Sequence, residues 1–544
     1  MSRFGWHGKV DCAAGTTSFI STWSLGRDMR ASASILVALL VVLAGCSALD
    51  GSSNATDTPE TTAPTDEMQT TAAQTTQTTT DGGDQSGDLA DPEEDVLGWE
   101  DGYWYNESIT VDRSDGLNDT ELERVVSRSM ARVEQVRGLE FESRVPVEII
   151  SREEYREQVQ SGNTTTADRL HQNVKWEAML MVDESTDAIA VQNRNSAGGV
   201  GGYYTPSEEQ IVIISDSETP EMDEITLSQE LFHGLQDQRF DISSFDQSTQ
   251  ELHNARDGII EGDGNLVDQR YQERCESDWD CLMPQQQQGG GGSSDIHLGL
   301  YQVSFQPYSD GVLFVQQLYE RGGWDAVNAV YQNPPASTEQ TIHPDRYPDE
   351  TPSYPTVEDR SNDDWQVLGL EDANNYASFG EAGLYVMFWY PSYQTTQATG
   401  QLTDVVIPYQ NHLNYDGQQL NQTDPFNYDH PITDGWAGDR LVPYVTDDSP
   451  STNETGYVWQ TEWDSESDAS EFADAYRDLL DHHDAQAVSD RANTYLIDDG
   501  AAYGDAYYVV QQGTSVVIVN APTVDGLSGV RSGAGTTNAS VVAA

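Results

Sequence analysis

Apolar positions recur at helical spacing in several stretches of the chain. In residues 120–137, for example, they fall three and four residues apart, as on one face of an amphipathic helix. Gly322 and Gly323 separate two neighbouring helical stretches, and Pro391 is expected to end another. Helices are predicted over residues 120–137, 223–240, 249–274, 308–322, 324–331, 380–391 and 465–482, and a further helix starts at residue 151.

Shorter apolar runs rich in branched and aromatic residues predict strands. The glycine-rich segment 198–202 is interpreted as a hairpin connection, and segments 333–344 and 425–440 as loops. Strands are predicted over residues 144–150, 188–192, 203–206, 210–215, 457–463, 507–511 and 515–520. This order indicates an α+β fold, with a small N-terminal sheet beside helices and a smaller C-terminal α+β unit.

The helix predicted over residues 223–240 carries the candidate chemistry. It contains Gln229-Glu-Leu-Phe-His233, and helical spacing sets Glu230 and His233 on one side, one turn apart. Zinc peptidases with a His-Glu-x-x-His helix use both histidines as ligands and the glutamate as general base. Here Gln229 occupies the first histidine position, and its neutral amide oxygen should bind zinc less well than imidazole. The structural alternative is an ordinary surface pair of Glu230 and His233.

The charge balance narrows the possible partners. The 544 residues include 92 acidic side chains against 26 lysines and arginines, a formal net charge of -66, and lysine is nearly absent. Such a chain should repel nucleic acid and anionic lipid surfaces. Acidic residues spread along the whole length suit high salt, where screening weakens self-repulsion, and indicate an extreme halophile. Recurring aromatic and aliphatic segments argue against a disordered acidic protein.

The N-terminal region predicts export. Met29-Arg30 precedes an apolar run from Ile35 to Leu43, followed by Ala-Gly-Cys46, as in a secretory signal. The run is too short to span a membrane. Leu43-Ala-Gly-Cys46 resembles the lipobox of lipoproteins, which implies lipidation of Cys46 and a lipid anchor on the extracellular face of the cell membrane. The predicted organisation is a mis-annotated upstream start (1–28), signal peptide (29–45), disordered Thr-rich spacer (46–95), first globular domain (96–360) and C-terminal α+β domain (361–544).

Cysteines and sequons fit a surface protein. Cys275 and Cys281 are close enough in sequence to form one small disulfide outside the cell, and a metal site is the weaker interpretation of this pair. Asn-x-Ser/Thr sequons predict glycosylation at Asn54, Asn106, Asn118, Asn163, Asn421, Asn453 and Asn538.

Longer strings around these motifs carry a family resemblance. The strings are Thr226–Gln238, Ile260-Glu-Gly-Asp-Gly-Asn265, Gly322-Gly-Trp324, Ser337–Pro344 and Gly435-Trp-Ala-Gly-Asp-Arg440. Over residues 96–544 the chain resembles gluzincin-like metallopeptidases and, more closely, haloarchaeal surface lipoproteins related to them.

The resemblance implies a gluzincin-like fold for residues 96–360 and assigns the site. Glu230 is then the general base, and His233 and Glu261 are zinc ligands, while Gln229 stands at the lost first ligand position. His253 lies on the same predicted helix as Glu261 but roughly 12 Å away, too far to share one zinc ion. His343 cannot be positioned from the sequence.

Three functions remain open. The first is a surface protein that has lost or reduced peptidase activity and binds a peptide or a cell-envelope partner. The second is an active zinc-dependent peptidase that tolerates Gln229. The third is a solute-binding lipoprotein, against which the missing two-lobed α/β pattern counts.

Overall fold

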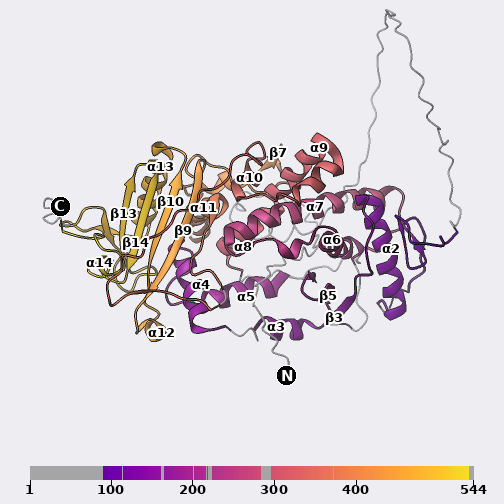
Figure 1. Cartoon of the computed structure of the whole chain (residues 1–544), viewed down its shortest axis with the longest axis horizontal. Helices are drawn as coiled ribbons and strands as arrows, with labels where there is room; N and C mark the ends of the chain where they lie inside the picture. The colour runs from indigo at the N-terminus through magenta and orange to yellow at the C-terminus, as the bar shows by residue number, and fades with distance from the viewer. Residues whose placement is uncertain are drawn as a thin grey trace, which may run out of the picture.

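The computed structural model shows a mixed α+β protein whose largest sheet lies at one end of an elongated molecule (Figure 1). It describes residues 90–112, 114, 116–160, 164–199, 201–215, 217, 223–283, 296–371 and 373–537. The predicted signal peptide and Cys46 lie outside the described residues. The predicted α+β class is confirmed.

The first described elements are a short hairpin and a long helix. Strands β1 (Trp99–Glu100) and β2 (Tyr103–Trp104) are antiparallel and lie beside α2 (Asp119–Arg137). Asn118 caps α2 by accepting from two backbone N–H groups, while the Glu121 carboxylate accepts from the N–H of Asn118. The predicted helix over residues 120–137 is therefore confirmed, with its start set by this capping box.

A three-stranded sheet stands next, with β5 in its centre. Strand β3 (Val147–Ile150) is parallel to β5 (Gln210–Ile214), and β4 (Gly202–Thr205) is the antiparallel edge strand. Helices α3 (Arg152–Gln160) and α4 (Thr166–Ala178) lie between β3 and β4 in sequence. The predicted small N-terminal sheet is confirmed.

One predicted strand is wrong. Residues 188–192 begin helix α5 (Ala188–Gly199) instead, and the glycine-rich segment ends this helix and leads into β4 rather than forming a hairpin. Asp187 supplies the helix start, because its Oδ1 accepts from the N–H groups of Ile189 (2.9 Å) and Ala190 (3.1 Å). The short alternation of Ala, Ile and Val could not distinguish strand from helix.

Four helices build the centre of the molecule (Figure 1). They are α6 (Glu224–Phe240), α7 (Gln250–Ser277), α8 (Leu298–Phe305) and α9 (Asp310–Val330). The predicted interruption of α9 is confirmed, since Gly322 and Gly323 have non-helical backbone angles. A short 3-10 helix, η2 (Gln306–Tyr308), joins α8 to α9.

Two predicted boundaries need correction. Segment 333–344 contains the short helix α10 (Thr338–Ile342) and is not all loop. Helix α11 (Gly380–Thr399) continues through Pro391 instead of ending there. The Phe388 carbonyl accepts from the N–H of Ile407 outside the helix (3.2 Å), which ties this part of α11 to the segment that follows it.

The C-terminal sheet has seven antiparallel strands in the order β11-β12-β13-β14-β10-β9-β6. Helix α13 (Glu466–His482) packs on it through Phe472 and Tyr476. Strand β9 begins at Trp436, inside the segment predicted as a loop. The strands are β6 (Gln366–Val367), β9 (Trp436–Val445), β10 (Gly456–Trp463), β11 (Gln486–Ala487), β12 (Thr494–Leu496), β13 (Ala506–Gln512) and β14 (Ser515–Ala521).

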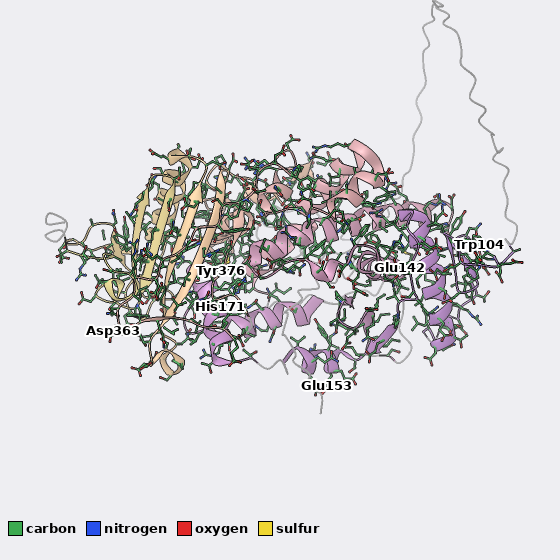
Figure 2. The ribbon with its side chains drawn as sticks, viewed as in Figure 1. Trp104, Glu142, Glu153, His171, Asp363 and Tyr376 are labelled. Carbon is green, nitrogen blue, oxygen red and sulfur yellow. A yellow bond between two sulfur atoms is a disulfide. The ribbon has the colours of Figure 1, made fainter. Side chains whose placement is uncertain are left out.

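The largest hydrophobic core runs across the predicted boundary between residues 360 and 361. It joins Trp176 of α4 and Val303 of α8 to Trp459 of the C-terminal sheet. His171 of α4 also hydrogen-bonds to the backbone of Tyr376, and the two side chains lie close together in Figure 2. No helix in the described part of the chain combines the length and apolar character that a membrane crossing requires.

Candidate functional site

Helices α6 and α7 bring Glu230, His233 and Glu261 together. His233 Nε2 lies 3.6 Å from Glu261 Oε2, and Glu230 Oε2 accepts from the backbone N–H of Tyr204 at 2.9 Å. The exposed fractions of the three residues are 6 %, 9 % and 8 %. The one-turn spacing on α6 thus places the acid and the histidine beside a glutamate from a second helix.

Burial and mutual charge set the protonation of this group. Burial raises the pKa of Glu230 to about 7, with Glu261 adding to the rise and His233 and the Tyr204 N–H opposing it. Burial also raises the pKa of Glu261, and the charge of His233 opposes that shift. For His233, burial disfavours the charged form, but the carboxylates of Glu261 and Glu230 outweigh it and the pKa rises. Burial thus favours the neutral form of both carboxyl groups, while their charges favour the protonated form of His233.

A buried hydrogen-bond chain fixes the His233 ring. The Gln236 amide nitrogen donates to the Ile260 carbonyl (2.9 Å) and to the Tyr331 hydroxyl (2.6 Å), and Tyr331 donates to Asp263 Oδ2 (2.7 Å). Gln236 Oε1 is then an acceptor, and at 2.8 Å it accepts from His233 Nδ1. The neutral ring consequently carries its proton on Nδ1 and presents Nε2 toward Glu261.

Arg137 anchors the far end of this chain. Its guanidinium pairs with the Asp263 carboxylate at 3.0 Å, and both side chains are fully buried. A buried ion pair is tolerated when additional hydrogen bonds satisfy its polar atoms, as Tyr331 does here for Asp263. The chain that orients His233 thus runs from Arg137 of α2 through Asp263 of α7 and Tyr331, which follows α9, to Gln236 of α6.

His233 and Glu261 do not complete a metal site by themselves, but their two facing atoms are spaced as two ligands of one ion would be. Two ligands about 2.1 Å from a tetrahedral zinc ion lie roughly 3.4 Å apart, close to the observed 3.6 Å between His233 Nε2 and Glu261 Oε2. Glu261 Oε2 is buried and has no hydrogen-bond partner. Gln229, buried one turn before His233, stands where a further imidazole would be needed.

Two residues near the site, Tyr308 and Asp268, were not found from the sequence. Tyr308 of η2 hydrogen-bonds to Glu261 and opposes the rise in the pKa of that carboxyl group. Asp268 lies on α7 two turns after Glu261, and its Oδ1 is buried without a hydrogen-bond partner. Helical spacing from Glu261 was a usable signal for Asp268, whereas Tyr308 arrives through tertiary packing.

The two additional histidines considered from the sequence lie elsewhere. His253 pairs with Asp257 of α7 at 3.2 Å. Asp257 lies one helical turn before Glu261, and His253 lies two turns before it. His343 Nε2 contacts Glu381 Oε1 at 3.1 Å, in a different group of side chains.

Within the described residues, three groups of side chains could hold a metal ion. They are His343, Glu381 and Asp429; Glu177, Glu184 and Asp505; and Glu339, Glu350 and Asp464. In each group the potential ligand atoms lie within 4.8 Å of one another.

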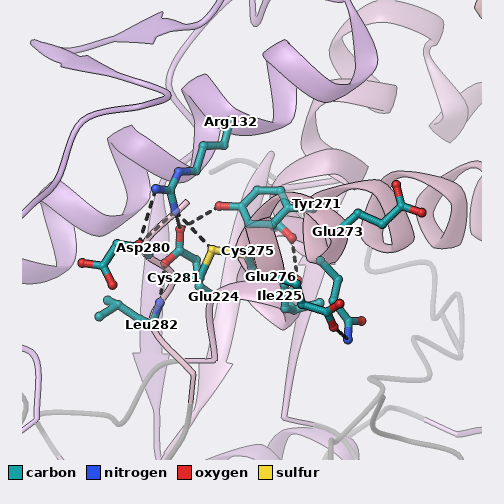
Figure 3. Close-up of a disulfide and its surroundings, with 12 residues drawn as sticks. Arg132, Glu224, Ile225, Tyr271, Glu273, Cys275, Glu276, Asp280, Cys281 and Leu282 are labelled. Carbon is teal, nitrogen blue, oxygen red and sulfur yellow. Dashed lines mark hydrogen bonds and ion pairs between the residues drawn. A yellow bond between two sulfur atoms is a disulfide. The ribbon is translucent and has the colours of Figure 1, made fainter. Parts of the chain in front are cut away.

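Cys275 and Cys281 form a disulfide beside a buried charge cluster (Figure 3). Glu224 is the centre of that cluster, because its carboxylate pairs with Arg128 (2.8 Å) and Arg132 (2.5 Å). The Tyr271 hydroxyl (2.7 Å) and the Leu282 N–H (2.7 Å) also donate to it. The disulfide closes the segment that brings the Leu282 N–H to Glu224.

The predicted glycosylation sites differ in their surroundings. Asn54, Asn163 and Asn538 lie outside the described residues, whereas Asn106 and Asn118 are exposed and Asn421 is half-buried. The Asn453 amide donates to the Glu184 carbonyl (2.8 Å) and accepts from Arg169 (2.9 Å). A glycan on Asn453 would be attached to the nitrogen that makes the bond to Glu184.

Comparison with known proteins gives one partial match. A family described as Domain of unknown function (DUF8575) matches residues 366–531, which span the C-terminal sheet from β6 through α14 (Leu527–Val530). Curated proteins and solved structures gave no match. The α6–α7 site lies outside the matched residues.

Proposed function

We propose that this chain is a lipid-anchored cell-surface protein on a gluzincin-like scaffold, with lost or reduced peptidase activity, that binds an extended peptide or a cell-envelope partner. The observation that carries the proposal is the incomplete donor set. His233 and Glu261 stand 3.6 Å apart as two zinc ligands would, but Gln229 replaces the imidazole expected one turn before His233.

The edge of β4 that faces away from β5 supports peptide binding. Tyr204 uses its outward N–H to contact Glu230 at 2.9 Å, so this edge borders the site. Among the described strands, β5 alone pairs with β4. An extended peptide can add to such an edge through main-chain hydrogen bonds. Its backbone would then run beside Glu230 and His233.

A second candidate is an active zinc-dependent peptidase, favoured by the orientation of His233. The Gln236 side-chain oxygen accepts a hydrogen bond from Nδ1–H of His233, which leaves Nε2 available as a ligand. Metal-bound histidines are usually oriented by a hydrogen bond of this kind. A bound zinc ion would polarise a carbonyl and lower the pKa of water. In this chain Glu230, with a pKa of about 7, would take up the proton, and Tyr308 would stay beside Glu261.

The decisive experiment restores the missing imidazole. The parent protein, Gln229→His and the control Gln229→Leu would be purified in molar KCl and titrated with zinc by calorimetry. We expect stoichiometric zinc on Gln229→His, with affinity at least tenfold above the parent, because a third protein ligand is added. Zinc affinity of Gln229→His no higher than that of the parent and of Gln229→Leu would show that position 229 does not face a zinc site with His233 and Glu261.

Activity and binding separate the two candidates. Fluorescein-labelled casein peptides serve as the probe, and cleavage and fluorescence anisotropy are followed together. Binding by the parent without cleavage supports the first function. Cleavage by the parent that Glu230→Gln abolishes would overturn it in favour of the peptidase.

A further inference from the structure

One stretch of the chain, residues 393–423, is almost uncharged. It contains two charged side chains, Asp404 and Asp416, and neither lysine nor arginine, whereas charged residues make up 22 % of the whole chain. Much of the stretch is exposed, and glutamine is the commonest of its exposed residues. The protein as a whole carries a net charge of -66, which keeps its surface hydrated and its copies apart. A neutral surface on such a protein indicates a contact that carboxylates would disturb.

Tyrosine side chains converge within this stretch. Tyr393 of α11 stacks on Tyr390, with ring centroids 5.9 Å apart, and on Tyr409 of the 3-10 helix η3 (Tyr409–His412), with centroids 6.4 Å apart. Burial raises the pKa of Tyr409, and the nearby hydroxyls of Tyr393 and Tyr415 add to the rise, so the three hydroxyl groups lie near one another. Tyr415 is 59 % exposed, and Tyr393 is half-buried. Aromatic surface is therefore presented to solvent beside uncharged amides.

The exposed tyrosine stands on a fixed hairpin. Strand β7 (Tyr415–Asp416) pairs with β8 (Gln419–Leu420). Just before β7, the Asn414 amide nitrogen donates to Asp424 Oδ2 at 2.8 Å, which holds the base of the hairpin. A surface that is already fixed loses little conformational entropy when a ligand binds to it.

The composition of this surface restricts what can bind to it. Residues 393–423 offer no lysine or arginine to a polyanion, and a cationic partner finds far more carboxylates on the rest of the chain. A second copy of the chain would need a largely apolar interface, but the large apolar side chains that this stretch exposes are Leu402 and Tyr415. The remaining class of partner is a neutral, polar ligand with apolar faces.

We propose that Tyr393, Tyr409 and Tyr415, together with the glutamines beside them, form a binding surface for a neutral oligosaccharide. The negative face of an aromatic ring attracts C–H groups that carry partial positive charge, as those on the face of a sugar ring do. The adjacent Gln394 and Gln410 are exposed, and their amides supply donors and acceptors for sugar hydroxyls. The inference uses no residue of the α6–α7 site and does not depend on the proposed function.

The test measures oligosaccharide binding by the full chain. The protein would be made in a bacterial host, so that Asn421 carries no glycan, labelled with a fluorophore and applied in molar KCl to an array of immobilised neutral oligosaccharides. We expect binding to some of these oligosaccharides. Tyr415→Ala, which alters an exposed side chain and should fold as the parent does, should weaken that binding about tenfold. Tyr393→Ala should have a similar effect.

Two control variants separate the ring from other effects of substitution. Tyr415→Phe keeps the aromatic ring and should retain most of the binding. Tyr103→Ala changes a half-buried tyrosine of β2 and should bind as the parent does.

Three results would overturn the proposal. The first is a parent protein that binds none of the arrayed oligosaccharides. The second is binding that Tyr415→Ala and Tyr393→Ala both leave unchanged, which would place the sugar elsewhere on the molecule. The third is a dimer in sedimentation velocity that Tyr415→Ala dissociates while no oligosaccharide is bound, which would assign the surface to a second copy of the chain.

Discussion

Single buried side chains of this protein are held in place by several polar partners at once. Gln236 illustrates this, because one amide group accepts from His233 and donates to Ile260 and Tyr331. An amide with all of these bonds has one orientation, so the tautomer of His233 follows from its neighbours. Had Gln236 been replaced by an apolar residue, the ring would lose its acceptor and the direction of Nε2 would no longer be fixed.

His412 gives a prediction about acid stability. Its ring is fully buried against Phe426 and Trp389, Nδ1 contacts the Asn427 carbonyl at 3.0 Å, and Nε2 has no hydrogen-bond partner. Burial lowers the pKa of His412 to about 3. The folded state therefore resists protonation, and stability that is present above pH 6.5 is lost as the pH falls toward 3. At pH 5 the loss is roughly 2 kcal/mol.

The variant His412→Asn should remove this titration while keeping a donor near Asn427. We expect it to be less stable than the parent at pH 8, because a cavity remains where the ring was. Between pH 8 and pH 5, however, it should lose roughly 2 kcal/mol less than the parent. Thermal unfolding across this range measures the difference. His482→Asn replaces an exposed ring whose pKa is lowered less, and it should recover less of the loss than His412→Asn does. Parallel pH curves for parent and His412→Asn would contradict the assignment.

At the scale of elements, a close contact between α7 and α9 positions the site. A Cβ atom added to Gly262 would stand 2.1 Å from the Gly311 carbonyl oxygen, and one added to Gly311 would meet the Gly258 backbone at 2.5 Å. The two helices therefore touch backbone to backbone. Gly262 directly follows Glu261, so this contact also sets the depth at which Glu261 stands.

We expect Gly262→Ala to destabilise the protein by about 3 kcal/mol or more, because neither backbone can move aside without opening the core. The control is Gly369→Ala, where an added Cβ would meet nothing within 4 Å and the backbone angle is ordinary. Differential scanning calorimetry in molar KCl compares the two. Equal Tm values for both variants would show that the helices have room to separate.

Elements were predictable where their signal is local. The helix over residues 120–137 was marked by its apolar period, and Asn118 with Glu121 fixed its start. The strand predicted over residues 188–192 failed because a five-residue apolar run fits either structure, and only Asp187 as a cap decides for helix. Pro391 led to the opposite error, because a helix end was predicted there. Helix α11 continues through the proline because tertiary packing outweighs the low helix propensity of proline.

At the scale of the whole molecule, net charge governs the conditions for folding. With a formal net charge of -66, the acidic side chains repel one another in the compact folded state. Salt weakens this repulsion, because the Debye length falls from about 10 Å at 0.1 M salt to about 3 Å at 1 M. We expect Tm to fall steeply when KCl is reduced from molar to 0.1 M. Circular dichroism during heating measures this. Sucrose at equal osmolality is the control, since it does not screen charge, and full rescue by sucrose would argue against charge repulsion as the cause.

The packing of α4 against the C-terminal sheet cannot be inferred from the order of elements. Trp176 of α4 and Trp459 of β10 share one hydrophobic core, although one precedes and the other follows the boundary predicted at residue 361. Glu177 and Asp505 meet across the same junction. The family match begins at residue 366 and so covers one side of this junction only.

The sequence by itself determined the α+β class, the main helices, and the one-turn spacing of Glu230 and His233, because each depends on residues a few positions apart. It also determined the net charge and the position of Gln229 one turn before His233. Only the tertiary structure decided that Glu261 Oε2 stands 3.6 Å from His233 Nε2 and that Tyr308 accompanies it. It alone decided that the carboxyl groups of Glu177 in α4 and Asp505 before β13 lie close together, since such contacts arise from packing between segments far apart in the chain.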